Sequence, residues 1–217
     1  MDMIWRIAVC LGLGYICGCV SFGYIVGKMQ KVDIRKYGSG NVGTTNALRT
    51  LGKKAALFTL LGDVLKCAIP VLLVKFLFFK DMEYRDLLGL YTALGAVLGH
   101  TFPFYLKFKG GKGIAVLVGT LLTFDWQLCI LCAITFFTVL AITRFVSLGS
   151  LLMEVEFVIW VAITRPGDWH MLALSAVFAV LAFYTHRENI KRLLSGTENK
   201  IGQKVKIEAE ASDESEK

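Results

Sequence analysis

Charge is scarce over long stretches of this sequence, and a clean alternation of apolar and polar residues is absent. Hydrophobic residues make up 55% of the 217 residues, which is more apolar surface than one soluble core of this size can bury. Membrane β-barrels need strands of about ten alternating residues, so the missing alternation excludes them. Since helices are the other way to satisfy backbone groups in lipid, the composition predicts an all-α integral membrane protein.

Seven apolar stretches are close to the length of about 20 residues that crosses a hydrocarbon layer. They cover residues 4–27, 55–79, 87–106, 113–124, 127–143, 146–164 and 168–186. The first lacks a basic amino-terminal region and a small-x-small cleavage site, so we expect a retained helix rather than a signal peptide. We predict one polytopic domain over residues 1–202, with about seven transmembrane helices.

Cysteine does not occur in a pattern that indicates a disulfide framework or a metal site. All six cysteines lie within the apolar stretches, where a thiol behaves as a small hydrophobic group. Cys129 and Cys132 have the CxxC spacing, but no second Cys or His pair accompanies them. We therefore expect no disulfide and no metal.

Basic residues are concentrated in alternate connections, which predicts the orientation in the membrane. They follow the first, third, fifth and seventh stretches, so the positive-inside rule places the N-terminus outside and the C-terminus in the cytoplasm. Four tryptophans near the outer boundary fit an aromatic belt: Trp5, Trp126, Trp160 and Trp169. The last ten residues hold five acidic residues and one lysine, and we predict a disordered tail over 203–217.

The first basic connection, residues 37–54, reads YGSGNVGTTNALRTLGKK. Such a loop can present backbone N–H groups to an anion. A helical turn would place Thr45, Asn46 and Arg49 on one side, where they can hold a phosphate. A polar turn with a snorkelling arginine is the alternative. The GxGxxG match at 38–43 lacks the strand and helix of a dinucleotide-binding unit, so we reject that interpretation.

The second basic connection carries two lysines around a glycine turn. Lys109 and Lys112 flank Gly110 and Gly111, and two amines with bare backbone suit a phosphate. The apolar run 114–124 is too short for a full span, so its amino end is expected within the membrane thickness, where lysines need partners or a wet cavity. Positive-inside anchors around a turn are the alternative, and His100 is expected to orient the loop.

The third basic connection, residues 186–202, sets an imidazole and an amide on one helical stripe, at His186 and Asn189. Glu188 and Arg192 are four residues apart and are expected to pair. An amphipathic helix on the membrane surface would look similar and is the alternative.

Further polar residues lie inside the apolar stretches. Asp63 and Lys66 are three residues apart, so we expect an ion pair that braces the site from below. Ser147 is expected to offer a hydroxyl at the cytoplasmic level. The sequence assigns no role to Glu154 and Glu156.

These connections resemble the three sequence blocks of the bacterial acyl-phosphate:glycerol-3-phosphate acyltransferase family (PlsY), from about Gly18 to Gly202. The residues that fit are Ser39-Gly40-Asn41, Gly43, Thr45-Asn46 and Arg49 in the first block; Gly99-His100, Phe102-Pro103 and residues 109–113 in the second; and His186, Asn189-Ile190, Arg192-Leu193, Gly196 and Glu198 in the third. Cys67 departs from the glycine that is usual there, and Cys19 and Ser21 replace a common Ser and Pro.

The resemblance implies an enzyme that moves a fatty acyl group from acyl phosphate to the sn-1 hydroxyl of glycerol 3-phosphate, without metal or cofactor. The products are lysophosphatidic acid and phosphate. We expect this enzyme in the cell inner membrane with its site on the cytoplasmic side, in contact with lipid and not with nucleic acid. The sequence is silent on the oligomeric state and on the acyl chain length.

The resemblance also implies roles for individual residues. The expected catalytic residues are Ser39, Arg49, Lys112, His186 and Asn189. The expected substrate-binding residues are Gly40, Asn41, Gly43, Thr45, Asn46, His100, Lys109, Gly110, Gly111, Gly113, Ser147 and Arg192. Our hypothesis assigns acyl phosphate to Ser39, the glycine amides, Thr45, Ser147 and one motif lysine, and glycerol 3-phosphate to Arg49, Lys112, His186 and Asn189. Either His186 or the phosphate of the donor takes the proton.

Other functions remain as alternatives. A transporter of a phosphorylated solute would share the basic vestibule and the broken helix, but the two halves show no internal repeat. A scaffold acting through the acidic tail would lose function when that tail is deleted. The His-x4-Asp motif of soluble-donor acyltransferases is absent, because Tyr105, Ser175 and Lys191 stand where an aspartate would be.

Overall fold

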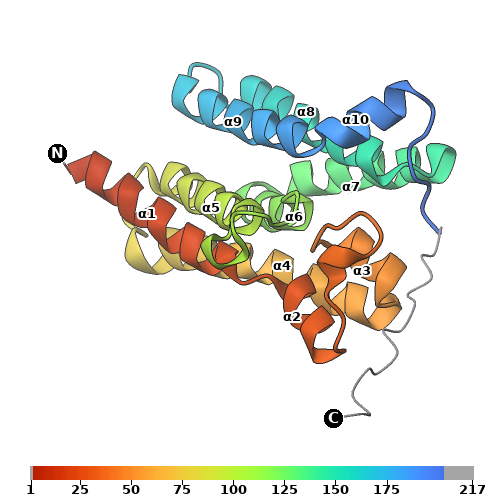
Figure 1. Cartoon of the computed structure of the whole chain (residues 1–217). Coiled ribbons are helices and arrows are strands. Elements are labelled where there is room, and N and C mark those ends of the chain that lie inside the picture. The colour runs from red at the N-terminus through yellow and green to blue at the C-terminus, as the bar shows by residue number, and fades with distance from the viewer. Residues whose placement is uncertain (1, 203–217) are drawn as a thin grey trace, which may run out of the picture.

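The computed structural model describes residues 2–202, and every regular element in this range is a helix (Figure 1). The helices are α1 (Asp2–Cys19), α2 (Phe22–Met29), α3 (Thr44–Thr50), α4 (Lys53–Leu73), α5 (Arg85–Thr101), α6 (Ile114–Phe124), α7 (Trp126–Thr143), α8 (Val146–Thr164), α9 (Trp169–Thr185) and α10 (Arg187–Leu194). Three short helical turns join them: η1 (Ile34–Lys36), η2 (Val74–Phe78) and η3 (Phe104–Leu106). The predicted all-α fold is confirmed, while the predicted tail 203–217 lies outside the described residues.

Each predicted apolar stretch coincides with a helix or a pair of helices. Within residues 2–202, five helical segments are long and apolar enough to cross a membrane, and α9 with α10, bent by 64°, makes a sixth if the pair counts as one. Helix α6 has 11 residues and falls short of that length, as its short apolar run predicted. The count of seven crossings and the outward N-terminus remain predictions.

The first stretch, predicted as one helix, is broken at Val20 and Ser21 into α1 and α2. Ser21 has an extended backbone, with φ −92° and ψ 93°. The hydroxyl of Tyr105 clamps the break, since it donates to the carbonyl of Cys19 at 2.8 Å and accepts from the N–H of Ser21 at 3.3 Å. The sequence does not reveal this break, because neither broken position is a glycine or a proline.

Helices α1 and α5 pack with their backbones in contact along a seam of small residues. Gly14 and Gly18 of α1 face α5, and Gly95 and Gly99 of α5 face α1. A Cβ atom at Gly14 would collide with the carbonyl oxygen of Thr92. Both helices therefore carry the small-xxx-small pattern that allows close helix packing in lipid, and the seam holds the end of α5 in place.

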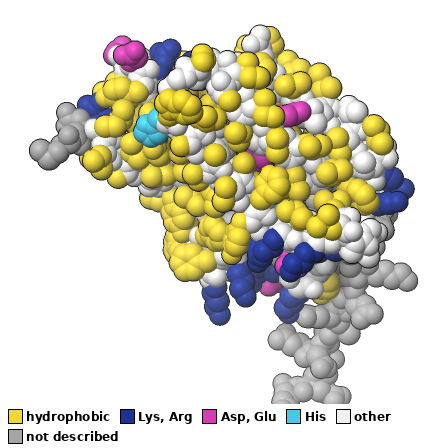
Figure 2. Space-filling view, turned by 90° about the horizontal axis from the view of Figure 1, so that it is seen from above, with side chains coloured by type: hydrophobic (Ala, Val, Ile, Leu, Met, Phe, Trp, Pro, Cys, Tyr) yellow, Lys and Arg dark blue, Asp and Glu magenta, His cyan; other side chains and the backbone are white. Residues whose placement is uncertain are grey.

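The outer surface is largely apolar, as Figure 2 shows for one face, where Lys and Arg side chains gather toward one edge. Ile142 exposes 78% of its surface and Ile163 exposes 71%. The interior is apolar too, with Leu117, Phe157 and Phe178 buried where α6, α8 and α9 meet. A chain that is apolar inside and outside is suited to lipid as its solvent.

The connections predicted to be cytoplasmic gather at one end of the bundle. Figure 1 shows α3 and α10 at the end of the molecule opposite the N-terminus. Nη2 of Arg49 on α3 lies 3.5 Å from the carbonyl oxygen of Asn199, although the two residues are 150 positions apart. The first and third connections therefore meet, and the second joins them through the contacts described below.

Candidate active site

The first connection is folded around the buried side chain of Asn46. Its Oδ1 accepts from the backbone N–H of Ser39 at 2.9 Å. Its Nδ2 donates to the carbonyls of Ile34, Tyr37 and Asn41 at 3.2, 3.1 and 2.8 Å. The amide that the sequence assigned to a substrate is thus engaged in shaping the loop.

The backbone amides of this loop are also engaged within it. Gly40 N donates to the Tyr37 carbonyl at 3.0 Å, and Gly43 N donates to Oδ1 of Asn41 at 2.8 Å. Gly40 has a φ of +69°, which favours glycine because it has no Cβ atom. Two glycine amides expected to bind phosphate therefore already have partners, and so does the N–H of Ser39. Ser39 and Gly40 remain exposed at the tip of the loop.

Helix α3 follows the loop and carries Thr45 and Arg49, both partly buried. Arg49 lies in the last turn, where it reaches the carbonyl of Asn199 and comes within electrostatic range of Glu198 and Arg192. Of the predicted group of Thr45, Asn46 and Arg49, only Thr45 and Arg49 keep side chains that can bind a ligand. The Asn46 amide is bonded to the backbone of the loop.

The glycine turn of the second connection sits on the end of α5. Gly111 N donates to the His100 carbonyl and Gly110 N to the Thr101 carbonyl, both at 3.0 Å. Gly113 has a φ of +89° and starts α6, a conformation that a residue with a side chain rarely adopts. The two glycine amides expected to bind phosphate are therefore also occupied, and His100 supports the turn.

The two motif lysines lie in different surroundings. Lys109 is exposed, whereas Lys112 is partly buried and its Nζ donates to Oδ1 of Asn189 on α10. The hydroxyl of Thr185 donates to the carbonyl of Lys112 at 3.3 Å. The second and third connections are therefore joined at Lys112 and not at Lys109.

Burial lowers the pKa of Lys112 to about 8. The neighbouring Glu198 works against this shift, and the cations Arg192 and Arg49 add to it. An ammonium that is crowded by two guanidinium groups and one carboxylate is poised to gain an anionic partner. The side chains of all three connections thus act on one another at this point.

Glu198 is the residue on which the cluster is built. Its Oε1 accepts from Ser147 Oγ at 2.9 Å and from Asn189 Nδ2 at 2.6 Å, and its Oε2 accepts from Arg192 Nε at 2.8 Å. Burial alone raises the pKa of Glu198, but these hydrogen bonds and the arginine more than offset it, so the pKa lies below its ordinary value. The carboxylate is therefore ionised and fixed.

The pairing predicted between Glu188 and Arg192 is wrong. Glu188 lies 3.1 Å from Lys191, while Arg192 pairs with Glu198. The carboxylate of Glu198 is buried, and a guanidinium gains more from such a partner than from an exposed one. Glu198 was recognised only as a member of the third block and was not predicted as a site residue.

His186 occupies the bend between α9 and α10 and is buried. Its Nδ1 lies 2.8 Å from the carbonyl oxygen of Ala182, so Nδ1 carries the hydrogen and donates it. Nε2 is consequently the nitrogen with a free lone pair. The ring lies within electrostatic range of Lys112 and Glu198, so the bend places the acceptor atom Nε2 of His186 near the cluster.

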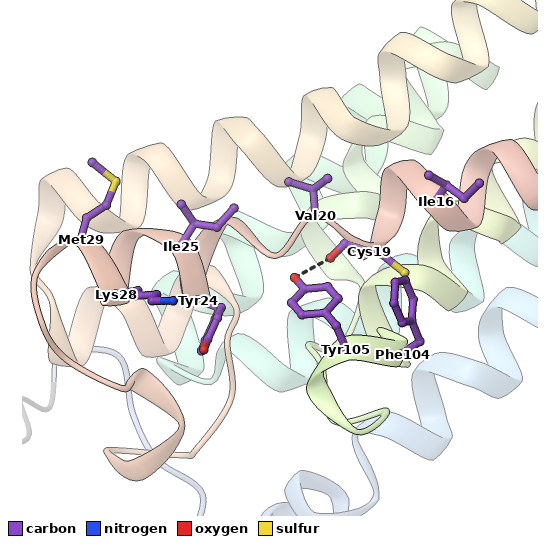
Figure 3. Close-up of a pocket in the computed structure, with 9 residues that line it drawn as sticks. All are labelled: Ile16, Cys19, Val20, Tyr24, Ile25, Lys28, Met29, Phe104 and Tyr105. Atoms are coloured by element: carbon purple, nitrogen blue, oxygen red, sulfur yellow. Dashed lines mark hydrogen bonds between the residues drawn. The ribbon is translucent and has the colours of Figure 1, made fainter.

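An apolar groove of about 650 Å³ runs beside the α1–α2 break (Figure 3). Its walls come from the end of α1, from α2 and from the turn that precedes the two motif lysines. The residues that line it are Ile16, Cys19, Val20, Tyr24, Ile25, Lys28, Met29, Phe104 and Tyr105. The groove therefore shares the second connection with Lys112.

Taken together, the structure brings some of the expected residues into one cluster and leaves others apart. The cluster contains Arg49, Lys112, Ser147, His186, Asn189 and Arg192, with Glu198 at its centre. Ser39, Gly40 and Lys109 are exposed, and the contacts of Asn41, Gly43, Asn46, Gly110 and Gly111 described above lie within their own connections. Three cations around one carboxylate make a site for an anion.

The expected ion pair of Asp63 and Lys66 is confirmed at 2.7 Å. Glu156 accepts from the Thr135 hydroxyl at 2.5 Å, and Glu154 is buried on α8. Over residues 2–202, no group of three or more His, Cys, Asp or Glu side chains is arranged to hold a metal ion.

The sequence pattern of the glycerol-3-phosphate acyltransferase family matches residues 8–196. A glycerol-3-phosphate acyltransferase of Thermoanaerobacter pseudethanolicus is 43% identical over 196 residues, which cover 90% of this chain and 96% of that relative. A glycerol-3-phosphate acyltransferase of Bacillus subtilis is 41% identical over 196 residues, with 90% and 97% covered.

Two crystal structures of PlsY, an integral membrane glycerol 3-phosphate acyltransferase, are similar to this fold. The glycerol 3-phosphate form has a TM-score of 0.82 and 33% identity, and it covers 90% of this chain and 96% of the other. The lysophosphatidic acid form has a TM-score of 0.79 and 32% identity, with 91% and 96% covered. By sequence and by fold, this chain belongs to the glycerol-3-phosphate acyltransferase family.

Proposed function

We propose that this protein is a membrane enzyme that transfers a fatty acyl group from acyl phosphate to the sn-1 hydroxyl of glycerol 3-phosphate. The observation that carries this proposal is the cluster of Arg49, Lys112 and Arg192 around Glu198, at one end of an apolar bundle. Relatives named glycerol-3-phosphate acyltransferase, and PlsY structures in a glycerol 3-phosphate form and a lysophosphatidic acid form, support it.

The cluster is proposed to hold the phosphate of glycerol 3-phosphate. Arg49, Lys112 and Arg192 supply guanidinium and ammonium donors, which bind a phosphate more strongly than neutral donors do. Asn189 divides its amide between Lys112 and Glu198, so we propose that it aims the lysine instead of touching the substrate hydroxyl. Ser147, bonded to Glu198, helps to fix that carboxylate.

The acyl phosphate is proposed to bind beside this cluster through side chains. The N–H groups of Ser39, Gly40, Gly43, Gly110 and Gly111 are already hydrogen-bonded within the protein, so these five are not available to a phosphate. Ser39 and Lys109 are exposed and Thr45 is partly buried, and we propose these three side chains as the ligands of this phosphate. This assignment replaces the glycine amides expected from the sequence.

The acyl chain is proposed to lie in the groove beside the α1–α2 break. Its lining is apolar along Ile16, Val20 and Ile25, and Ile16 exposes 70% of its surface, so the groove is open to lipid. Substituting Val20 with Phe would shorten the groove and shift the preference toward shorter acyl phosphates. A series of donors of different chain length measures this, and an unchanged preference would remove the groove from the proposal.

The reaction is proposed to proceed by attack of the sn-1 oxygen on the acyl carbon. The bond from that carbon to the phosphate oxygen breaks, and inorganic phosphate leaves. The hydroxyl proton passes to Nε2 of His186, whose other nitrogen is held by Ala182, or to a phosphate oxygen of the donor. His186→Gln distinguishes the two: large retention of kcat at saturating substrates would assign the proton to the donor.

The site is proposed to face the cytoplasm from the bacterial inner membrane. The support is the concentration of lysine and arginine in the connections that follow the first, third, fifth and seventh apolar stretches. A cysteine placed at the exposed position 109 should react with an impermeant maleimide in inverted vesicles and not in intact spheroplasts, in a background without reactive native cysteines. The opposite pattern would reverse the orientation.

The direct test of the function uses purified protein in detergent with acyl phosphate and radiolabelled glycerol 3-phosphate. An enzyme yields lysophosphatidic acid without a sealed compartment, and Arg49→Ala should abolish that product. A transporter of a phosphorylated solute yields none, and it moves solute only across the wall of a vesicle.

A further inference from the structure

Three buried polar side chains lie beneath the glycine turn of the second connection and have no part in the mechanism above. Lys66 Nζ lies 2.7 Å from Asp63 Oδ1 and 2.7 Å from Nδ1 of His100. Their side chains are 3%, 1% and 3% exposed in the order Lys66, Asp63, His100. Charges at such depth are costly in an apolar bundle unless they are paired and hydrogen-bonded.

Lys66 makes a third contact that joins separate parts of the chain. Its Nζ donates to the carbonyl oxygen of Val20 at 2.8 Å, at the break between α1 and α2. Figure 3 shows Val20 there, next to the bond between Tyr105 and Cys19. One ammonium on α4 thus holds the break and the last turn of α5 together.

The contact with Lys66 also fixes the state of His100. An ammonium group can only donate, so Nδ1 of His100 accepts and the ring hydrogen is on Nε2. The Nε2 edge faces Gly111 so closely that a Cβ atom there would collide with it. The His100 carbonyl also accepts from Gly111 N, so the ring and the carbonyl of His100 together fix the position of Gly111.

Gly111 is followed directly by Lys112, the lysine that reaches the cluster. Lys112 is held at its carbonyl by Thr185 and at its ammonium by Asn189. A shift of the His100 ring would therefore move Gly111 and the backbone of Lys112, while the ammonium of Lys112 stays bonded to Asn189 on α10. Small displacements of a binding group change affinity strongly.

We propose that Lys66 is a positioning residue for glycerol 3-phosphate: by fixing the His100 ring, it seats Gly111 and places Lys112 at the phosphate. This inference rests on the proposed function, in which Lys112 binds that phosphate. A charged pair that only stabilises the bundle would lower folding stability and affect both substrates alike. A positioning residue raises the KM of one substrate.

The chain contains a matched control at the other end of α5. Lys75 lies 2.9 Å from Asp86 and donates to the carbonyl of Thr123 at 2.7 Å. It is a buried lysine bonded to an aspartate and to a backbone carbonyl, as Lys66 is. Asp86 is in the first turn of α5 and His100 in the last, so this pair is remote from the cluster.

The experiment compares two double variants, D63N/K66M and K75M/D86N. Each removes both charges of one pair, which avoids leaving a single buried charge behind. For D63N/K66M we expect the KM of glycerol 3-phosphate to rise by about tenfold, with kcat and the KM of acyl phosphate changing by less than about threefold. For K75M/D86N we expect all three constants within about threefold of wild type.

A second measurement reads the His100 ring without any substrate. The chain has three histidines, so H170Q and H186Q variants allow the ¹⁵N signals of His100 to be assigned in detergent. Wild type should show the hydrogen on Nε2, and K66M or D63N/K66M should shift the signals toward the other tautomer or a mixture.

Three results would overturn the proposal. The first is an unchanged KM of glycerol 3-phosphate in folded D63N/K66M, the second an equal loss in both double variants, and the third a His100 tautomer that is the same with and without Lys66. A wild-type protein that forms no lysophosphatidic acid would instead overturn the proposed function, because the tautomer measurement stands apart from turnover.

Discussion

The two glycine-containing loops look alike in sequence, yet they contribute to the site in different ways. In the first loop, the Asn46 side chain binds the backbone and the glycines shape an exposed tip. In the second, the end of α5 binds the backbone and a lysine beyond the glycines turns inward to Asn189. The bonded glycines of both loops therefore shape the chain, and under the proposed function charged side chains bind the anion.

The largest effect is expected when the two motif lysines are removed one at a time. We expect Lys112→Met to lower kcat/KM for glycerol 3-phosphate by about 10³-fold, because it deletes a charge inside the cluster. Lys109→Met should lower it by less than about tenfold, since Lys109 is exposed. Steady-state kinetics in detergent measures both, and equal losses would show that the two lysines act alike.

Glu198→Gln tests whether one carboxylate organises the cations. We expect kcat/KM to fall by about 10²-fold, because Arg192 loses its partner and repulsion among the cations grows. Retained activity with a raised affinity for phosphate would contradict this, since it would mean that Glu198 only competes with the substrate. Glu188→Gln, which alters an exposed pair, is the control and should be neutral.

Asn46→Ala tests whether the Asn46 side chain holds the first loop in shape through its bonds to the loop backbone. The substitution leaves the N–H of Ser39 and three carbonyls without their partner, so the tip should lose its shape. We expect about a tenfold loss in kcat/KM, seen mainly with acyl phosphate as the varied substrate. Asn41→Ala removes only one bond, to Gly43, and should cost less.

The smallest effect is expected from pH. The pKa of Lys112 is about 8 in the free protein, so its ammonium is present below that pH and is lost above it. The KM of glycerol 3-phosphate should therefore rise with pH, by about fourfold at pH 8.5 relative to pH 7. Lys112→Arg should flatten this rise, because arginine stays charged; a flat profile in wild type would contradict the assignment.

The fold followed from patterns that are local in the sequence. Each apolar stretch coincided with one or two helices, and a spacing of three predicted the ion pair of Asp63 and Lys66, because neighbours on a helix are fixed by its period. The same reasoning paired Glu188 with Arg192 and failed. Burial of Glu198, which lies beyond the end of α10, decided that contact, and the spacing of residues within a helix does not identify partners outside it.

The site was predicted as a meeting of three connections, and the contacts of Arg49 with Asn199 and of Lys112 with Asn189 confirm that they meet. The sequence could not predict which polar groups are free to bind a ligand and which are bonded within the protein. Whether an amide binds a ligand or its own loop depends on tertiary contacts, as the Asn46 side chain and the Gly111 N–H illustrate.

The groove beside the α1–α2 break is open along its side, with Ile16 and Met29 exposing 70% and 79% of their surfaces. Under the proposed function, a donor's tail can slide in from the bilayer and the product's tail can slide back out. Pulling a 16-carbon chain into water would cost roughly 12 kcal/mol, at about 0.8 kcal/mol for each methylene. A lateral opening avoids that barrier, so product release need not limit turnover.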